Sequence, residues 1–380
     1  MKIRNGQPPP RHQKPDGDSI RVPKKERLFL QSRLLQWYQR YQRDLPWRGT
    51  LDPYRVWISE VMLQQTQVKT VVPYYNHFLA TFPNVRTLAK AEIPKLLKSW
   101  AGLGYYSRAR NLKKAARVIL DQHAGRFPKT VEAVHALPGI GRYTAAAILS
   151  ICFNQPLAVL DGNVMRVLTR IFKITGSIKD SKVQHLLWEI AQAVLDRENP
   201  GDFNQALMEL GATVCTPRQP KCASCPWEKR CLAKKLGMQE SLPEKGKKLV
   251  SRETHCAAFL VEYAGKILIV RRSGTGQLQG FWEFPSLEWQ GPRLTGAMLA
   301  KRFQEKFSLP LRGLKKPAMQ LRHSITTRRI TMNVYQASLP EAFELPNRGR
   351  DSRWVSRTGL AKYPFSSATL KILKRMNLRA

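Results

Sequence analysis

The residues of this chain with the clearest chemical potential are its cysteines. Four of the six crowd into one segment while Cys152 and Cys256 stand apart, and the four are spaced Cys215-x6-Cys222-x2-Cys225-x5-Cys231. Four thiolates on a short loop can complete the shell of one zinc ion or hold one four-iron cluster. Four free cysteines are the remaining alternative, which this crowding disfavours. The pattern is typical of a metal site in a reducing compartment, because six cysteines are too few to staple a chain of 380 residues.

A second motif places two glycines in a tight turn before a helix. It reads Leu137-Pro138-Gly139-Ile140-Gly141-Arg142-Tyr143-Thr144 and is followed by an alanine-rich run. Outward-facing N–H groups of such a turn, with the start of the next helix, can bind a phosphate without reading base sequence. The alternative is a corner between two helices with a glycine cap.

The charge balance points to a polyanionic partner. Lys and Arg number 64 against 27 Asp and Glu, which gives a formal net charge of +37. Nucleic acid is the leading partner for such a charge. A membrane surface or mere solubility is the alternative, but no apolar run approaches the ~18 residues of a spanning helix, so no membrane partner is expected. Residues 1–25 lack the apolar stretch of a secretory signal and are interpreted as a flexible basic tail.

These motifs need elements to position them, and the first part of the chain has the pattern of helices. From Glu26 to about Met208 apolar residues recur at helical spacing, and turn signals such as Asp52-Pro53, Phe82-Pro83 and Phe127-Pro128 divide the segment. The sequence therefore predicts an all-α domain over residues 26–232, closed by the cysteine loop at 215–231. Residues 233–252 are polar and Lys-rich, the composition of a linker.

Beyond the linker the pattern changes to short β-like runs. Strands are predicted at residues 255–263 and 266–270, joined by a hairpin turn at Ala264-Gly265. Further strands are predicted around residues 317–324 and 329–337, with helices at 295–307 and from 366 to about 376. The sequence thus predicts an α+β domain over residues 253–380.

Taken together, these motifs resemble the MutY family of adenine DNA glycosylases, in the helix-hairpin-helix superfamily that includes endonuclease III. The resemblance covers about residues 27–375. Besides the hairpin and the cysteine spacing, it rests on Pro46-Trp47-Arg48, Ser59-Glu60-Val61-Met62-Leu63-Gln64-Gln65-Thr66-Gln67-Val68, Trp100-Ala101-Gly102-Leu103-Gly104-Tyr105-Tyr106, Leu160-Asp161-Gly162-Asn163-Val164 and Phe203-Asn204-Gln205-Ala206-Leu207. The family holds a [4Fe-4S] cluster, so the resemblance favours that cofactor over zinc at Cys215, Cys222, Cys225 and Cys231.

Base excision of this kind needs an acid for the departing adenine and a carboxylate for the cationic sugar. The resemblance implies Glu60 for the first role and Asp161 for the second. In its local sequence Glu60 begins an apolar stretch, where burial would raise its pKa, although a glutamate at a helix N-terminus is the commoner reading. Asp161 precedes a helix predicted over residues 164–172 and fits an N-cap, a role compatible with catalysis.

The resemblance also assigns the residues around these carboxylates. Tyr143 and Asn163 are implied as supports of the site. Endonuclease III-type enzymes carry a Schiff-base lysine at the position of Tyr143, and a phenol cannot form an imine, so a monofunctional glycosylase is expected. The implied contacts to the extruded adenine are Trp47, Arg48, Leu63 and Gln205. The implied contacts to DNA are Gln65, Thr66, Tyr105, Gly139 and Gly141. Alternatively, Trp47 and Tyr105 are core aromatics, and Arg48 and Gln205 are solvated.

The second domain resembles Nudix hydrolases at Gly280-Phe281-Trp282-Glu283-Phe284-Pro285. Its corresponding helix reads Lys301-Arg302-Phe303-Gln304-Glu305-Lys306, and one Glu among cations cannot hold Mg²⁺ on a triphosphate. We therefore expect this domain to bind without catalysing. In the family it reads a damaged guanine through a Phe-Ser-His loop, where this chain has His323-Ser324-Ile325-Thr326-Thr327-Arg328-Arg329. Readout is expected from the remaining hydroxyls, those of Ser324, Thr326 and Thr327.

The sequence thus predicts a helix-hairpin-helix glycosylase with a [4Fe-4S] loop, linked to an α+β Nudix-like reader. The expected substrate is double-stranded DNA in which adenine is mispaired with 8-oxoguanine or guanine. An endonuclease III-like pyrimidine glycosylase and lyase is one alternative, and a non-catalytic lesion-binding protein is another. We expect a monomer in the cytoplasm, with the bacterial nucleoid, while the basic, acid-poor N-terminus leaves organelle targeting open.

Overall fold

The computed structural model describes residues 22–244, 246, 252–272, 278–325, 328–340 and 351–378. The chain forms two compact units. The first consists of the chain up to Gln42 together with Asn154–Gly246, and the second of Arg43–Phe153 together with the chain from Lys247 onward. The helical region, which its composition presents as one domain, therefore contributes to both units.

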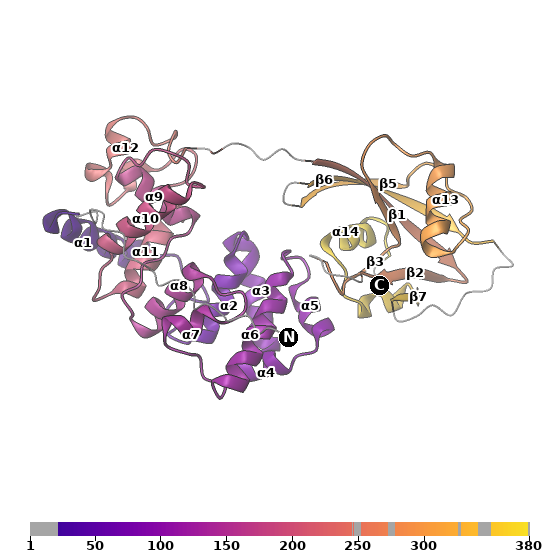
Figure 1. Cartoon of the computed structure of the whole chain (residues 1–380), viewed down its shortest axis with the longest axis horizontal. Coiled ribbons are helices and arrows are strands. Elements are labelled where there is room, and N and C mark those ends of the chain that lie inside the picture. Colours follow the sequence, from indigo (N-terminus) through magenta and orange to yellow (C-terminus); the bar gives the residue numbers. More distant parts are fainter. Residues whose placement is uncertain are drawn as a thin grey trace, which may run out of the picture. The chain divides into compact units, whose positions relative to one another are not determined.

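The helical part of the first unit is built around the cysteine segment. Its elements are α1 (Lys24–Tyr41), α9 (Gly162–Ile171), α10 (Ser181–Val194), α11 (Pro200–Thr213), η1 (Cys222–Ser224), η2 (Glu228–Arg230) and α12 (Leu232–Lys235), labelled in part in Figure 1. The Gln31 amide of α1 donates to the carbonyls of Val194 and Leu195, at 3.1 and 2.9 Å. The buried Trp227 indole donates to Leu30 O at 2.9 Å. These bonds fasten α1 to α10 and to the cysteine loop.

Parts of the expected basic tail and of the expected linker are ordered in the structure. Helix α1 begins at Lys24, within the expected basic tail, of which residues 1–21 lie outside the described residues. In the expected linker, α12 starts the segment, Leu242 is buried, and Arg170 Nε donates to Leu242 O at 2.9 Å. The chain up to Glu244 therefore packs on the first unit. Composition does not predict this packing because a single buried leucine and a backbone carbonyl hold it.

The helical part of the second unit follows the predicted turn signals. Its elements are α2 (Pro53–Leu63), α3 (Val68–Thr81), α4 (Val85–Lys90), α5 (Ile93–Trp100), α6 (Ser107–Gln122), α7 (Val131–His135) and α8 (Arg142–Phe153). Pro53 opens α2 at its first turn, and the Asp52 carboxylate accepts from Tyr54 N at 2.9 Å. Proline lacks an N–H, so it is well placed at a helix start, where that group has no intrahelical partner.

The rest of the second unit is a mixed sheet with helices. Its elements in the described residues are β1 (Arg252–Tyr263), β2 (Lys266–Arg271), β3 (Trp282–Glu283), β4 (Ser286–Trp289), α13 (Gly296–Phe307), β5 (Met319–Ile325), β6 (Arg328–Ser338), β7 (Ser352–Ser356), η3 (Thr358–Lys362) and α14 (Ser367–Arg375). The main strand order is β3-β2-β1-β6-β5, with β4 also paired to β1 and β7 to β2. Strands β1 and β6 run parallel and the other pairs antiparallel (Figure 1).

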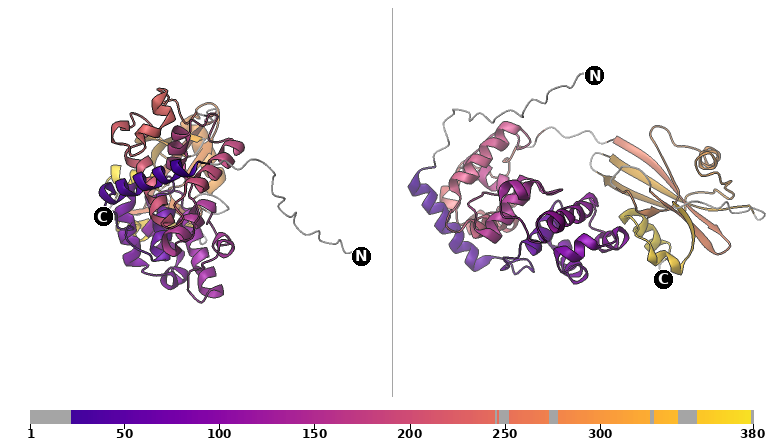
Figure 2. Two further views of the ribbon diagram at one scale, coloured as in Figure 1. Left: turned by 90° about the vertical axis from the view of Figure 1, so that its left-hand side faces the viewer. Right: turned by 60° about the horizontal axis from the view of Figure 1, so that its bottom comes forward.

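Strand β1 shows why the sheet carries a helix on each face. Ala258 and Leu260 pack with Ile372 and Leu373 of α14, whereas the alternate residues of β1 belong to the cluster that contains the α13 side chains. Alternation follows from the two-residue period of a strand, and Figure 2 shows the two helices on opposite sides of the sheet. The predicted β1–β2 turn is confirmed, since Ala264 and Gly265 both have positive φ, 47° and 69°.

Among the described residues, no helix combines the length and the apolar character that crossing a bilayer requires.

Candidate active site and cysteine loop

Glu60 lies in the last turn of α2, a helix that is buried over most of its length. Its side chain is 6% exposed, and the Tyr143 hydroxyl donates to Glu60 Oε2 at 2.6 Å. The alternative of a glutamate at a helix N-terminus is therefore wrong. A carboxylate in the last turn gains nothing from the helix macrodipole, whose negative end lies there. The structure thus brings Tyr143, expected as a support of the site, into direct contact with Glu60.

The glycine turn ends directly before α8, and Tyr143 is the second residue of that helix. Gly139 has φ +81°, and a Cβ placed there would lie 2.6 Å from Asn111 Cβ, so glycine is required. Ile140 is buried beneath the turn, while Gly139 and Gly141 are exposed. The turn thus leaves its backbone accessible at the start of α8.

Asp161 is the N-cap of α9, as its sequence position predicts. Oδ1 accepts from Val164 N at 2.7 Å, and Oδ2 accepts from the Asn163 amide at 2.9 Å. Burial raises the pKa of Asp161 above its usual value, while these hydrogen bonds act in the opposite direction. Asn163 is therefore a direct support of the carboxylate.

Two buried arginines connect this region to the cysteine segment. Arg166 donates to Asn163 Oδ1 at 2.8 Å and to Cys215 O at 2.7 Å. Arg170 Nη1 donates to Cys215 Sγ at 3.3 Å and to Thr216 O at 2.7 Å. The Asp161 carboxylate and the first cysteine are thus joined through two side chains. Sequence reasoning missed both arginines; the one available signal is that Arg166 follows Asn163 at a helical spacing of three.

The four clustered cysteines line one apolar cavity of the first unit, together with Val167, Leu210 and other residues. All four are half-buried. Burial raises the pKa values of Cys222, Cys225 and Cys231, to about 12 for Cys225. Thiolates in such a place need a bound cation to be stable. Within the described residues, no group of three His, Cys, Asp or Glu side chains is arranged to hold a single metal ion. The four thiols that line the cavity are candidate ligands for a metal ion or a cluster.

The residues predicted to contact adenine are spread over both units. Trp47 is buried on the segment before α2, and its ring packs edge-on against that of Tyr75, with the ring centres 5.3 Å apart. Arg48 follows it, and Leu63 is the half-buried last residue of α2. Gln205 lies on α11 of the first unit.

The residues predicted to enter DNA lie on two turns of the second unit. Gln65 and Thr66 lie between α2 and α3, and Tyr105 lies between α5 and α6. Gln65 and Tyr105 both adopt left-handed backbone conformations, with φ of 56° and 46°, and Tyr105 is 44% exposed. Non-glycine residues rarely occupy this region, and those that do are concentrated at functional sites.

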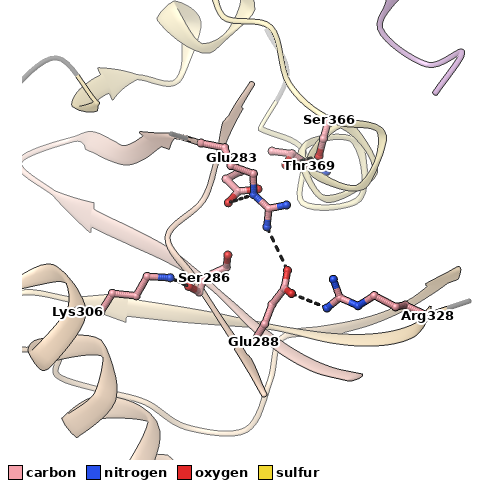
Figure 3. A network of polar contacts seen from close by, with 8 residues as sticks. Glu283, Ser286, Glu288, Lys306, Arg328, Ser366 and Thr369 are labelled. Atoms are coloured by element: carbon pink, nitrogen blue, oxygen red, sulfur yellow. Dashed lines mark hydrogen bonds and ion pairs between the residues drawn. The ribbon is translucent and has the colours of Figure 1, made fainter. Parts of the chain in front are cut away.

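In the sheet domain, the groups around the Nudix-like motif neutralise one another. Arg272 donates to Glu283 at 3.2 Å and to Glu288 at 3.1 Å, and Arg328 donates to Glu288 at 2.7 Å (Figure 3). Lys306 of α13 donates to Ser286 O at 2.9 Å. Although burial opposes it, the two arginines hold the pKa of Glu288 below its usual value. These carboxylates therefore face arginines, where a Nudix hydrolase needs carboxylates free for a divalent metal.

Of the predicted reader residues, Ser324 is exposed on β5. Thr326 and Thr327 lie outside the described residues.

Comparison with known proteins gives two family matches. The model of the HhH-GPD superfamily base excision DNA repair proteins matches residues 58–193, and the NUDIX domain model matches residues 256–375. The adenine DNA glycosylase of Homo sapiens is 36% identical over 402 residues, covering 90% of this chain and 72% of that protein. The adenine DNA glycosylase of Buchnera aphidicola subsp. Acyrthosiphon pisum is 44% identical over 213 residues, covering 56% of this chain and 61% of that protein. A solved structure of a thermostable thymine-DNA glycosylase is 33% identical with a TM-score of 0.52, covering 56% of this chain and 98% of that one.

Proposed function

Since the chain belongs to the adenine DNA glycosylases of the HhH-GPD base excision repair superfamily, we propose that it removes adenine mispaired with 8-oxoguanine or guanine from double-stranded DNA. The observation that carries the proposal is the 2.6 Å hydrogen bond between Tyr143 and the buried Glu60. This bond orients the carboxyl group that gives a departing purine the proton it needs.

The two carboxylates divide the chemistry of hydrolysis. Glu60 gives its proton to a ring nitrogen of adenine, which leaves with the electron pair of the N-glycosidic bond. Asp161 stabilises the positive charge that develops on the sugar. Water then adds to the C1′ atom of the sugar and gives up a proton, which restores the acid form of Glu60. The hydrogen bonds from Val164 and Asn163 favour the ionised form of Asp161, which this role requires. Tyr143 cannot form an imine, so strand cleavage is not part of the reaction.

The cofactor that fits the cysteine loop is a [4Fe-4S] cluster held by Cys215, Cys222, Cys225 and Cys231. Four thiols around one apolar cavity supply the donor set of such a cluster. When bound, the cluster cross-links the loop. This chain's own Arg166 and Arg170 then tie the loop to α9, where Asn163 holds Asp161.

The remaining assignments concern the DNA. Trp47, Arg48, Leu63 and Gln205 receive the extruded adenine, while Gln65, Thr66 and Tyr105 occupy the duplex that it leaves, with Gly139 and Gly141 on the backbone. The domain at residues 253–380, joined to residues 26–232 by the linker at 233–252, reads the opposite base through Ser324, Thr326 and Thr327. The net charge of +37 supports binding of a polyanion. We propose that the protein acts as a monomer, in the cytoplasm of a bacterium.

The proposal is tested by Glu60→Gln and Asp161→Asn in single-turnover excision from a duplex with one adenine opposite 8-oxoguanine. Each change removes a transition-state role and keeps the side chain's size, so we expect loss of excision by about 10³-fold or more with DNA affinity largely kept. Asp180→Asn is the matched control, because Asp180 caps α10 as Asp161 caps α9. A rate near that of the unaltered protein in either test variant rejects the assignment of that residue.

A further inference from the structure

Arg108, the second residue of α6, is a buried cation whose guanidinium donates to no carboxylate among the residues that the structure describes. Its side chain is 7% exposed, and the acceptors of its hydrogen bonds are all backbone carbonyls or a threonine hydroxyl. Burial lowers the pKa of Arg108 to about 10, so the group still carries its charge at neutral pH. Its Nε has no hydrogen-bond partner among the described residues, so Nη1 and Nη2 make all of these bonds. A buried charge held in this way needs an explanation beyond packing.

One set of these bonds holds the turn that carries Gln65. Nη1 donates to Val61 O, Met62 O and Gln64 O, at 2.9, 2.8 and 2.6 Å. These carbonyls lie at the end of α2, where backbone oxygens have no intrahelical partner and a positive charge is favourable. Nη2 adds a bond to Thr66 Oγ1 at 3.2 Å. The guanidinium therefore contacts both neighbours of Gln65.

A second set holds the turn that carries Tyr105. Nη2 donates to Leu103 O and Gly104 O, both at 3.2 Å. The guanidinium carbon lies 5.4 Å from the centre of the Trp100 ring and 5.6 Å from that of Tyr105. One planar group thus joins two turns that are far apart in the sequence and that carry the left-handed residues Gln65 and Tyr105.

We propose that Arg108 is the positioning residue that keeps the Gln65 and Tyr105 turns at the spacing needed to extrude adenine. The inference rests on the function proposed above, in which these two side chains enter the duplex. Left-handed conformations of non-glycine residues persist only where their surroundings enforce them. The fork of Arg108 enforces both at once, which a point charge on a lysine stem cannot do.

The test uses the full-length protein and two duplexes, one with adenine opposite 8-oxoguanine and one with adenine opposite an abasic-site analogue. Adenine in the second duplex has no pairing partner, so extruding it needs less help from the two turns, while the chemical step is the same. We expect Arg108→Lys and Arg108→Met to slow single-turnover excision from the first duplex by about 10- to 100-fold, as misplacement by ~1 Å does. On the second duplex both variants should lose several-fold less of the excision rate, and Arg108→Lys should lose less than Arg108→Met.

Arg117→Met is the matched control, because Arg117 lies on the same helix but is exposed and pairs with Asp121. This variant should change the excision rate on neither duplex.

A second readout replaces the target adenine by 2-aminopurine, whose fluorescence rises when it leaves the stack. The Arg108 variants should reduce this rise at saturating protein. Should Arg108→Met fail to fold, Arg108→Lys carries both readouts.

Equal losses on both duplexes, or no loss on either, overturn the role of Arg108. Gln65→Ala and Tyr105→Ala in the same assay separate this failure from failure of the proposed function. If those two variants show the selective loss and the Arg108 variants do not, only the inference about Arg108 falls. If Gln65→Ala and Tyr105→Ala do not show the selective loss, the proposed entry of these side chains into the duplex is wrong. The inference about Arg108 is then wrong as well.

Discussion

At the scale of single residues, the burial of Asp161 that suits its proposed role in catalysis lowers the stability of the folded protein. The carboxylate is held in a buried place by hydrogen bonds from Val164 and Asn163. Burial nevertheless raises its pKa, which means that the folded state prefers the protonated form. The proposed reaction requires the ionised form of Asp161, and this form destabilises the folded state.

We expect Asp161→Asn to unfold at a higher temperature than the unaltered protein at pH 7. The folded pKa of Asp161 lies above its unfolded value of 3.8, so the cost of its charge is fully present above the folded pKa and disappears as the pH falls through that range. Asparagine keeps the cap to Val164 N through its single acceptor oxygen and loses only the bond that the Asn163 amide donates to Oδ2. Thermal unfolding measured at several pH values checks this.

The advantage of Asp161→Asn should shrink as the pH approaches the ordinary pKa of aspartate. Asp180→Asn, at an exposed cap, should change the unfolding temperature little at any pH. A destabilised Asp161→Asn at neutral pH contradicts the account of Asp161.

At the scale of elements, the contact between α9 and α11 sets the position of Asn163. A Cβ on Gly211 of α11 would lie 2.7 Å from Asn163 Cβ and 3.0 Å from its carbonyl oxygen. Gly211 O also accepts from Arg166 at 2.8 Å. Glycine is needed here for close approach of two helices, not for its backbone freedom.

Gly211→Ala should therefore push Asn163 away and slow excision by about 10- to 100-fold through misplacement of Asp161. Gly162→Ala is the matched control, since it adds the same methyl group next to Asp161 but meets no atom within 4 Å outside its two chain neighbours. Single-turnover rates and DNA affinity are the measurements. Equal rates for the two variants would show that the α9–α11 contact does not control the site.

The cysteine loop is the second element whose role can be measured. The purified protein should be brown and contain about four irons per chain, as a Cys₄ site of this kind implies. Cys225→Ser should lower the iron content, whereas Cys152→Ser and Cys256→Ser should not, because these two residues do not line the cysteine cavity. Stoichiometric zinc with no visible absorbance contradicts the assignment.

Several elements could be predicted from the sequence because their signals are local. The spacing of apolar residues and the Ala264-Gly265 turn located β1 and β2, and a proline located the start of α2. Strands β3, β4 and β7 were missed, since each is only two to five residues long. Short strands give too few residues for a period to appear.

At the scale of the whole molecule, the net charge and the motifs predicted the class of protein. Contacts between residues far apart in the sequence could not be predicted from them. Glu60 and Asp161 were found because they lie within motifs. Arg108 and Arg166 were not, because most of their partners are backbone carbonyls, which leave no trace in side-chain identity. The division of the helical region at Gln42 and Phe153 had no compositional signal either.

The central claim is that this protein hydrolyses the bond between adenine and its sugar opposite 8-oxoguanine. The most direct measurement identifies the base released from a duplex with one such pair, near physiological salt, where non-specific binding of so basic a chain is weakened. Half of each sample is treated with alkali before the strands are sized. The account predicts free adenine and strand cleavage after alkali alone. Release of a pyrimidine, cleavage without alkali, or binding with no base released would contradict it.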